Sequence, residues 1–308
     1  MTQFRHALVT GGAGFIGSHL TRTLLDAGRK VTVLDNLSVG RRQAVPDGVR
    51  FIHGDIRDER TVTEALADVD CVFHLAAQVT IRGSFDRFYE DLDTNIMGTA
   101  RLLRAVDPAT VKWFTLASSM AVYADAPSPA PIRESHPTIP ISPYGIGKLA
   151  AEGVARQILE ARGVPFSAVR YFNTFGPGQT YTPYVGVITI FVTRLVGGQA
   201  ITVFGDGEQQ RDFVHVDDIA AGTMATVGRA PGTYNLGTGR GTSLNQLADL
   251  LIRRLAPGQH PGHAPAQAGE LRFSVADISA ARTALGYQPT RSLEADLDEV
   301  VADIRGRR

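Results

Sequence analysis

The chain has 308 residues, of which 44% are hydrophobic and 20% are charged. Its 31 acidic and 31 basic side chains give a formal net charge of zero, which argues against a general nucleic-acid or membrane-surface binder. No apolar run approaches the roughly 20 residues of a membrane-spanning helix, and the N-terminus lacks a signal-peptide pattern, so we expect a cytoplasmic location. The single cysteine, Cys71, excludes an intramolecular disulfide and a cysteine-based metal cluster, and its apolar neighbours favour a buried structural thiol.

The first half of the chain alternates short apolar runs with segments of helical period, which is the pattern of a parallel sheet covered by helices. Most of the strand candidates are apolar without alternation, as expected of strands that are buried on both faces. These strands are expected at 6–10, 31–35, 50–53, 70–76, 113–118 and 166–171. Helices are expected at 16–27, 61–67, 88–106 and 144–161.

After Tyr171 the rhythm changes, because glycine and proline residues at 176–183 indicate irregular backbone. A helix near 187–195 and a strand at 201–204 follow, and then strand candidates at 212–216 and 233–236 that we expect to extend the large sheet. Amphipathic helices are expected at 243–255 and 292–304, with a surface connection at 257–269. The sequence therefore predicts an α/β fold, with a Rossmann-type, doubly wound parallel sheet (1–171 and 212–240) and a smaller, discontinuous C-terminal substrate domain (172–211 and 241–308).

A glycine-rich turn follows the first strand and opens the first helix. Gly11, Gly14 and Gly17 form a GxxGxxG pattern, and a turn without side chains lets backbone amides and a helix N-terminus approach a pyrophosphate. Asp35 ends the second strand, where a carboxylate can bind an adenosine ribose and repel a 2′-phosphate. The alternative is a merely tight turn, but the strand before it and the helix after it favour a dinucleotide site that prefers NAD to NADP.

Two more segments follow strands and are expected to line the same crevice. Asp55 and Ile56 follow the third strand, and Leu75, Ala76 and Ala77 follow the fourth. Because the carboxyl ends of parallel strands meet at one edge of the sheet, these residues should lie near the dinucleotide. For Asp55 the alternative is a helix cap.

Ser119, Tyr144 and Lys148 form the group of side chains that suggests catalysis. Tyr144 and Lys148 lie four residues apart at the start of a predicted helix, so both project from one face. A nearby ammonium favours the phenolate, so we expect Lys148 to lower the pKa of Tyr144 from about 10 and to let it exchange a proton with a hydroxyl near neutral pH. Ser119 ends the fifth strand and can hydrogen-bond the same hydroxyl or its ketone.

The Tyr-x-x-x-Lys spacing alone is common by chance. Here it follows a dinucleotide turn in chain order, and Lys148 is one of only three lysines among 31 basic residues. A plain surface charge in this chain would more often be arginine, whose geometry and hydration differ from those of lysine. Both observations favour a catalytic role for the pair.

Together these residues resemble the extended short-chain dehydrogenase/reductase superfamily, and specifically its NAD-dependent sugar-nucleotide epimerases of the UDP-glucose 4-epimerase type. The resemblance extends over nearly the whole chain, from Gly11 to the segment around Asp277. Besides the groups above, it rests on the stretches at 35–38, 95–99, 118–123, 170–173, 176–177, 205–208 and 211–216. It implies a seven-stranded Rossmann-type domain beside a small sugar-nucleotide domain, and a homodimer formed through the helices near 88–106 and 144–161.

The resemblance also implies roles for residues that spacing alone does not assign. To the NAD site it adds Phe15, Ile16, Asn36, Ser38, Asn95, Ser118 and Tyr171. To a UDP-sugar site it assigns Ser84, Met120, Asn173, Val203, Phe204, Arg211, Arg272 and Ser274, beside Ser119 and Tyr144. For the residues at 173, 203–204 and 211 the alternatives are a capping asparagine, a plain strand and a surface salt bridge. In the implied reaction Tyr144 takes the proton of the sugar 4-hydroxyl as hydride passes from carbon 4 to NAD, the 4-keto sugar turns over, and hydride returns to the opposite face.

Three departures from the family pattern bear on the substrate. Dehydratase relatives carry an Asp-Glu pair after the catalytic hydroxyl, and Met120 and Ala121 stand there instead, so ordinary 4,6-dehydration is not expected. Gln267 stands where the family has a second diphosphate-binding arginine, a charge that Arg272 could replace. Ser274 stands where a bulky tyrosine restricts some epimerases to unsubstituted hexoses, and a small residue there admits a 2-acetamido group. A uronic acid derivative also stays open.

Several functions therefore remain open at this point. The leading hypothesis is 4-epimerisation of a UDP-hexose. The enzymatic alternatives are a UDP-glucuronate decarboxylase and an NAD(P)H-dependent reductase of a 4-keto nucleotide sugar, and the non-enzymatic alternative is a redox-sensing regulator that binds NAD. A sensor needs no proton relay, so the Ser119, Tyr144 and Lys148 set argues for an enzyme.

Overall fold

The structure, a computed structural model, describes residues 4–182, 186–266 and 271–307. A seven-stranded sheet forms its centre, and every neighbouring pair of strands in that sheet is parallel. Across the sheet the strands are β3 (Arg50–His53), β2 (Lys30–Asp35), β1 (His6–Thr10), β4 (Cys71–His74), β5 (Trp113–Ser119), β6 (Phe166–Tyr171) and β11 (Gly232–Leu236). The order reverses between β1 and β4, which creates a crevice at the carboxyl ends of those strands. The predicted α/β, Rossmann-type fold is confirmed.

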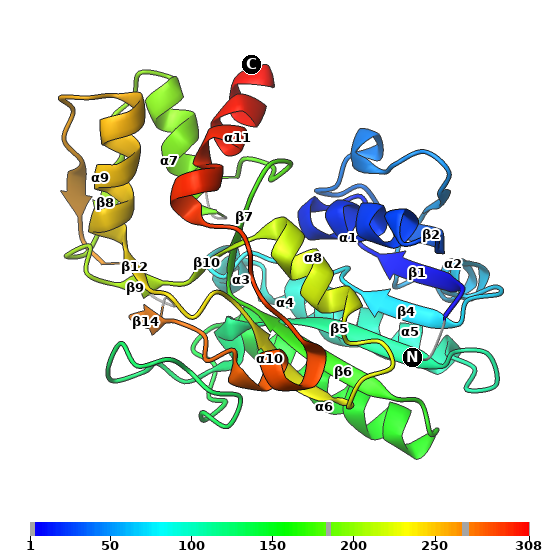
Figure 1. Cartoon of the computed structure of the whole chain (residues 1–308). Coiled ribbons are helices and arrows are strands. Elements are labelled where there is room, and N and C mark those ends of the chain that lie inside the picture. Colours follow the sequence, from blue (N-terminus) through cyan, green and yellow to red (C-terminus); the bar gives the residue numbers. More distant parts are fainter. Residues whose placement is uncertain (1–3, 183–185, 267–270, 308) are drawn as a thin grey trace.

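Helices cover both faces of this sheet (Figure 1). One face carries α2 (Glu59–Ala65), α5 (Thr99–Ala105) and α6 (Pro143–Ala161), and the other carries α1 (Phe15–Asp26) and α8 (Val216–Met224). Adjacent strand residues divide between the two cores: Leu8 packs on the side of α5, and Val9 packs on the side of α1. Because both faces need apolar side chains, the strands show no polar alternation.

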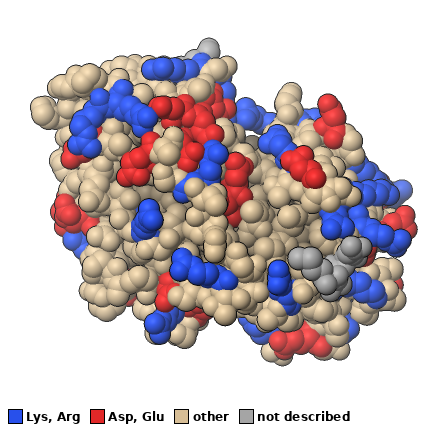
Figure 2. Space-filling view, in the orientation of Figure 1, with Lys and Arg blue, Asp and Glu red and all other residues tan. Residues whose placement is uncertain are grey.

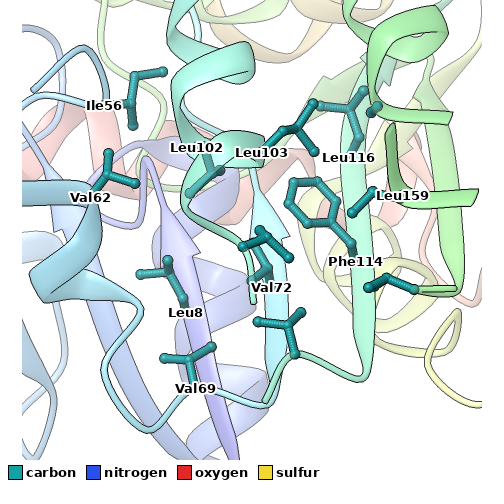
Figure 3. Close-up of a cluster of buried hydrophobic side chains, with 14 of the residues drawn as sticks. Leu8, Ile56, Val62, Val69, Val72, Leu102, Leu103, Phe114, Leu116 and Leu159 are labelled. Carbon is teal, nitrogen blue, oxygen red and sulfur yellow. The ribbon is translucent and has the colours of Figure 1, made fainter. Parts of the chain in front are cut away.

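Figure 3 shows the first of these cores. Leu8, Val72 and Phe114 extend from the strands toward Leu102 and Leu159 of the covering helices. All five side chains are fully buried. Burial of this kind stabilises the sheet by roughly 1.5–3 kcal/mol for each large side chain.

A smaller part with its own apolar core lies beside the carboxyl ends of the strands (Figure 1). It contains α7 (Val187–Val196), α9 (Leu244–Leu255), α11 (Leu293–Gly306) and the pair β8 (Thr202–Phe204) and β13 (Gly262–Ala264). The strands β12 (Thr242–Ser243), β9 (Gln210–Arg211) and β14 (Phe273–Ser274) form a three-stranded sheet. The domain boundaries at 171/172, 211/212 and 240/241 stay a prediction. α10 (Ser279–Leu285) packs with β11 of the large sheet, although the sequence assigned it to the smaller domain.

The predicted strand at 212–216 does not extend the large sheet. Only Phe213–His215 is a strand, β10, and it pairs in parallel with β7 (Asn173–Phe175) in a sheet of two strands. Val216 already begins α8, because the side chain of His215 caps that helix by accepting the amide of Asp217. The expectation failed because the apolar run spans the end of a strand and the start of a helix.

Two other predicted segments are more complex than expected. The single helix at 88–106 consists of α4 (Phe88–Leu92), a π-helical segment η2 (Asp93–Gly98) and α5. The surface connection at 257–269 contains β13, which pairs in parallel with β8. Short helical turns that were not predicted are η1 (Arg42–Ala44), α3 (Gly83–Asp86) and η3 (Met120–Val122).

Acidic and basic side chains are interspersed on the face shown in Figure 2, in keeping with the zero formal charge. Among the described residues, no helix is long and apolar enough to cross a membrane.

Candidate active site

A cleft of about 660 Å³ follows the carboxyl ends of β1 to β6. It extends from the glycine turn after β1 to the first residues of α7 in the smaller part, and it falls within the usual size of ligand sites. The crevice that the strand order predicts is therefore present.

The glycine turn is tight because each of its glycines lies close to another part of the backbone. Gly11 has a φ of +72°, and a β-carbon there would lie 2.7 Å from the amide nitrogen of Ala76. A β-carbon on Gly17 would lie 2.1 Å from the carbonyl oxygen of Gly11. Gly14 faces the cleft at the N-cap of α1. Side chains at Gly11 and Gly17 would therefore force the turn open and displace the amides that it presents at the start of α1.

Two helices direct free amides toward the cleft. Among the described helices of nine or more residues, α1 and α7 are the two without a side-chain cap, and neither has an acidic residue in its first turn. Gly14 and Gly186 occupy their N-cap positions, and both line the cleft. An uncapped N-terminus carries unsatisfied amides and a partial positive charge, so both helix ends favour an anion.

The carboxylate of Asp35 organises the loop after β2. It accepts the amides of Ala13 at 2.9 Å and Leu37 at 2.8 Å, and it lines the cleft. The side-chain amide of Asn36 donates from Nδ2 to the carboxylate of Asp55 at 2.9 Å. Asp55 also accepts hydrogen bonds from the guanidinium of its neighbour Arg57. These bonds with Arg57 lower the pKa of Asp55 to about 2, so it stays ionised.

Nearly all of the residues expected to bind the dinucleotide lie along this cleft. The sequence-predicted residues that line it are Gly11, Gly14, Phe15, Ile16, Gly17, Asp35, Asn36, Ser38, Asp55, Ile56, Leu75, Ala76, Ala77, Ser118, Tyr144, Lys148 and Tyr171. The phenol of Tyr171 is hydrogen-bonded to Thr223 of α8 at 2.8 Å.

Asn95 lies behind the cleft. Its side-chain oxygen accepts the amide of Gln78 at 2.9 Å, and its side-chain nitrogen donates to the carbonyl of Gln78 at 3.1 Å. Gln78 itself lines the cleft. Asn95 therefore holds the backbone of a cleft residue.

Ser119, Tyr144 and Lys148 all line the cleft, so the tertiary structure brings the predicted group together. Tyr144 and Lys148 lie in the first two turns of α6, which begins at Pro143 and is capped by Ser142. The ammonium of Lys148 donates to the carbonyl of Ala117 at 2.9 Å.

The electrostatics of this group differ from the sequence-based expectation. Burial raises the pKa of Tyr144 to about 12, a hydrogen bond with Ser119 acts in the opposite direction, and the charge of Asp91 raises it further. Burial lowers the pKa of Lys148 to about 8, although Asp91 and Glu152 favour its charged form. The prediction that Lys148 lowers the pKa of Tyr144 below 10 is therefore wrong for the protein alone, because burial of the phenol dominates.

The residues assigned to the substrate are divided between the cleft and its surroundings. Met120 and Asn173 line the cleft, as Ser119 and Tyr144 do. The side-chain oxygen of Asn173 is buried and has no hydrogen-bond partner among the described residues. A buried amide oxygen without a partner is costly, which favours a donor supplied by a bound molecule.

Ser84 has a different place. Its hydroxyl accepts the amide of Tyr144 at 3.1 Å and donates to the carbonyl of Ile81 at 2.6 Å. The residue is fully buried and does not line the cleft. It anchors the first turn of α6, and with it Tyr144.

Five more of the assigned residues lie outside the cleft lining: Val203, Phe204, Arg211 and Ser274 belong to the small sheets, and Arg272 directly precedes β14. β9 and β14 pair in parallel, so Arg211 lies opposite Ser274. Arg272 forms an ion pair with Asp206 at 2.8 Å. Gln267 lies outside the described residues.

Other cleft residues were missed, namely Leu34, Val39, Gly40, Gly54, Gln78, Val79, Thr80, Ile81, Arg87, Thr94, Ala117, Phe172, Thr174, Gln179, Thr180, Thr182, Gly186, Val187, Ile188 and Phe213. Many of them lie in the irregular loops after β4 and β7. These loops carry no periodic signal, and only their position after a strand could have indicated them.

Residues 7–237 match the family model of the NAD dependent epimerase/dehydratase family. The chain belongs to this family. It is 35% identical to the UDP-glucose 4-epimerase of Mycolicibacterium smegmatis, over 97% of this chain and 98% of that protein.

The similarity extends to solved structures within the same family. The UDP-glucose 4-epimerase of Thermotoga maritima with UDP-glucose has a TM-score of 0.94, is 35% identical, and covers 98% of this chain and 99% of its own. The UDP-N-acetylglucosamine 4-epimerase of Methanobrevibacter ruminantium has a TM-score of 0.93, is 31% identical, and covers 100% of both chains.

Proposed function

We propose that this chain holds NAD in the cleft and interconverts a UDP-hexose with its 4-epimer. The observation that carries the proposal is that Ser119, Tyr144 and Lys148 line the same cleft as the glycine turn of α1. A group that moves a proton thus lies in one continuous space with a site for an anionic dinucleotide. Membership of the family and the likeness to UDP-sugar 4-epimerases support the same function.

The residues at one end of the cleft fit NAD. A β-carbon on Gly17 would lie 2.1 Å from the carbonyl oxygen of Gly11, so only glycine allows the turn to present its amides to a pyrophosphate. Asp35 would bind the adenosine ribose with the oxygen lone pairs left by its two backbone bonds. When bound, NAD supplies the acceptor and the donor of a hydride, so net redox is zero.

Tyr144 is the group that moves the proton. As the phenolate it takes the proton of the sugar 4-hydroxyl, and as the phenol it returns a proton to the 4-keto oxygen. Because burial holds the pKa of Tyr144 at about 12, the phenolate must be stabilised by positive charge and hydrogen bonds. The ammonium of Lys148 supplies part of that charge, and Ser119 donates to the reacting oxygen.

The other end of the cleft fits the diphosphate of the substrate. The uncapped N-terminus of α7 presents free amides there. Asn173 lies in the same lining, where the nitrogen of its side-chain amide would donate to a phosphate oxygen and its partnerless oxygen would accept from a hydroxyl of the bound molecule. We assign the diphosphate to these two groups. The nucleotide beyond it we assign to Arg211, which lies on β9, and to Arg272, which lies next to β14.

The identity of the sugar is tested with a panel. Purified protein is incubated with UDP-glucose, UDP-galactose, their 2-acetamido derivatives, UDP-glucuronate and dTDP-glucose, and the configuration at carbon 4 is followed by NMR. We expect epimerisation of a UDP-hexose without added cofactor, and release of NAD when the protein is denatured. Formation of a 4-keto sugar with stoichiometric reduction of added NAD(P) would identify a reductase working in reverse, release of carbon dioxide would identify a decarboxylase, and no turnover of any nucleotide sugar would contradict the proposal.

We also propose that the protein is a homodimer joined through α4, η2 and α6. Large apolar side chains are exposed on these packed elements, namely Phe88, Tyr89, Met97, Ile146 and Ile158. Gly153 on α6 has open space where a β-carbon would stand, which lets a second helix approach closely. A monomer rarely exposes an apolar patch of this kind, so a second copy that covers it is the expected partner.

A further inference from the structure

Asp91 is a carboxylate that is only 2% exposed, on α4 beside the catalytic helix. Burial raises its pKa to about 6, and it is therefore ionised at neutral pH inside the protein. A buried charge is costly unless it has a partner, so its position calls for an explanation.

The surroundings of Asp91 connect it with the cleft in two directions. Its Oδ1 accepts the side-chain amide of Asn95 at 2.9 Å, and the same amide group holds both backbone groups of Gln78. Asn95 has two N–H donors, and Asp91 and the carbonyl of Gln78 take one each. Asp91 therefore determines the orientation of the amide that fixes Gln78 at the edge of the cleft.

In the other direction Asp91 faces α6. A β-carbon on Gly147 would lie 3.4 Å from the Oδ1 of Asp91, so the absence of a side chain there brings the carboxylate against the backbone next to Lys148. The charge of Asp91 acts on two groups of that helix, favouring the charged form of Lys148 and the neutral form of Tyr144.

The other charged and titratable groups around this pair have distinct effects. Arg87, which precedes α4, favours the ionised form of Asp91. Glu152 on α6 favours the charged form of Lys148. His74 on β4 is neutral near pH 7, because burial and the charge of Lys148 lower its pKa to about 3. Asp91 and Glu152 are thus the two carboxylates that favour the charged form of Lys148.

We propose that Asp91 is a positioning residue for the proton transfer. Its carboxylate lies against the backbone of α6 next to Lys148 and, together with Glu152, favours the charged form of Lys148, and through Asn95 it holds the backbone of Gln78 in the cleft. Asp91 is not among the residues that line the cleft. The catalytic part of this inference rests on the proposed function, whereas its effect on Lys148 does not.

The chain offers a direct test because it has only three lysines, Lys30, Lys112 and Lys148. NMR of the labelled lysine side chains gives three titrating signals, and the loss of one signal in Lys148→Gln assigns Lys148. In Asp91→Asn we expect the pKa of Lys148 to fall from about 8 by about half a unit or more, because a stabilising charge is lost. The control Glu90→Gln removes an exposed carboxylate from the same helix and should leave the titration in place.

A second measurement examines the same coupling from the other partner. Because coupling between two sites is reciprocal, Lys148→Gln should raise the pKa of Asp91 above about 6 in carbon NMR of the aspartate carboxyls. This result remains available if Asp91→Asn fails to fold. Unchanged titration of Lys148 in folded Asp91→Asn, or of Asp91 in folded Lys148→Gln, would overturn the proposal.

The catalytic readout is the pH profile. Loss of the negative charge lowers the pKa of both Tyr144 and Lys148, so the whole kcat profile of Asp91→Asn should move to lower pH. A residue with only a structural role would lower kcat without moving the profile. If the wild-type protein turns over no nucleotide sugar, the proposed function fails while the NMR titrations still decide the role of Asp91.

Discussion

The ammonium of Lys148 donates a hydrogen bond of 2.9 Å to the carbonyl oxygen of Ala117. This bond connects α6 to the end of β5, two residues before Ser119. It fixes the distance between the helix that carries Tyr144 and the strand that carries the serine. The lysine therefore has a positional role as well as an electrostatic one.

From this contact we predict that Lys148→Arg lowers kcat by at least about 100-fold, because the planar guanidinium cannot occupy the position of the compact ammonium in a buried site. Steady-state kinetics with the UDP-hexose measures the loss. The matched control is Lys112→Arg, since Lys112 is exposed and its ammonium donates to two carbonyls of its own loop, those of Pro108 and Ala109. Full activity of Lys148→Arg would show that geometry at this position is unimportant.

Tyr144→Phe removes the proton-transfer group and should lower kcat by about 100-fold to 10,000-fold, while bound NAD is retained. Turnover and the NAD released on denaturation are measured on the same preparation. A variant that lost its NAD as well would indicate a role for the phenol in binding, and one that kept its activity would exclude Tyr144 as the acid–base group.

The pKa of Tyr144 should depend on the cofactor. In the protein alone burial raises it to about 12, and a bound cationic nicotinamide ring favours the phenolate. We expect NAD to lower this pKa by at least about one unit. The absorbance of the phenolate is followed as the difference between wild type and Tyr144→Phe, with and without NAD. The same pKa in both states would contradict the proposed arrangement of phenol and nicotinamide.

Gly17→Ala should abolish NAD binding, because a β-carbon there would lie 2.1 Å from the carbonyl oxygen of Gly11 and the turn would have to open. The amount of NAD that co-purifies and its dissociation constant measure the effect. Gly306→Ala is the control, since a β-carbon at that helical position meets nothing within 4 Å. Normal NAD content in Gly17→Ala would separate the turn from the cofactor site.

Met97→Glu should dissociate the proposed dimer, because it places a charge among the exposed apolar side chains of α4, η2 and α6. We expect the dissociation constant to rise by about 30-fold or more, as judged by light scattering over a range of concentrations. Arg253→Glu, an exposed change on α9, should leave the assembly intact. A wild-type protein that is already monomeric would contradict the proposed interface.

Much of this architecture follows from local patterns in the sequence. The strands of the large sheet were predicted to within one or two residues at most ends. Strands that are buried on both faces appear in the sequence as continuous apolar runs, whichever strands they pair with. The glycine spacing predicted the turn, because only glycine tolerates the approach of Gly11 to the backbone of Ala76. The spacing of Tyr144 and Lys148 predicted a shared helix face, because helical geometry is local.

The contacts between distant segments could not be predicted in this way. The sequence assigned Asn95 to the cofactor and Ser84 to the substrate, but it did not indicate that Asn95 holds the backbone of Gln78 or that Ser84 anchors α6. The π-helical segment and the pairing of β10 with β7 depend on packing between elements far apart in the chain. No local pattern in the sequence indicates which distant segment a helix or strand will contact.

The amino-acid order by itself determined the type of fold, the place of the glycine turn and the common helix of Tyr144 and Lys148, since each depends on neighbours along the chain. Only the tertiary structure decided the charge state of that pair. The pKa of Tyr144 reflects how deeply the folded chain buries the phenol, and the pKa of Lys148 reflects that burial together with the carboxylates of Asp91 and Glu152. Burial and long-range charge are sums over the whole molecule, and they exist only once the chain has folded.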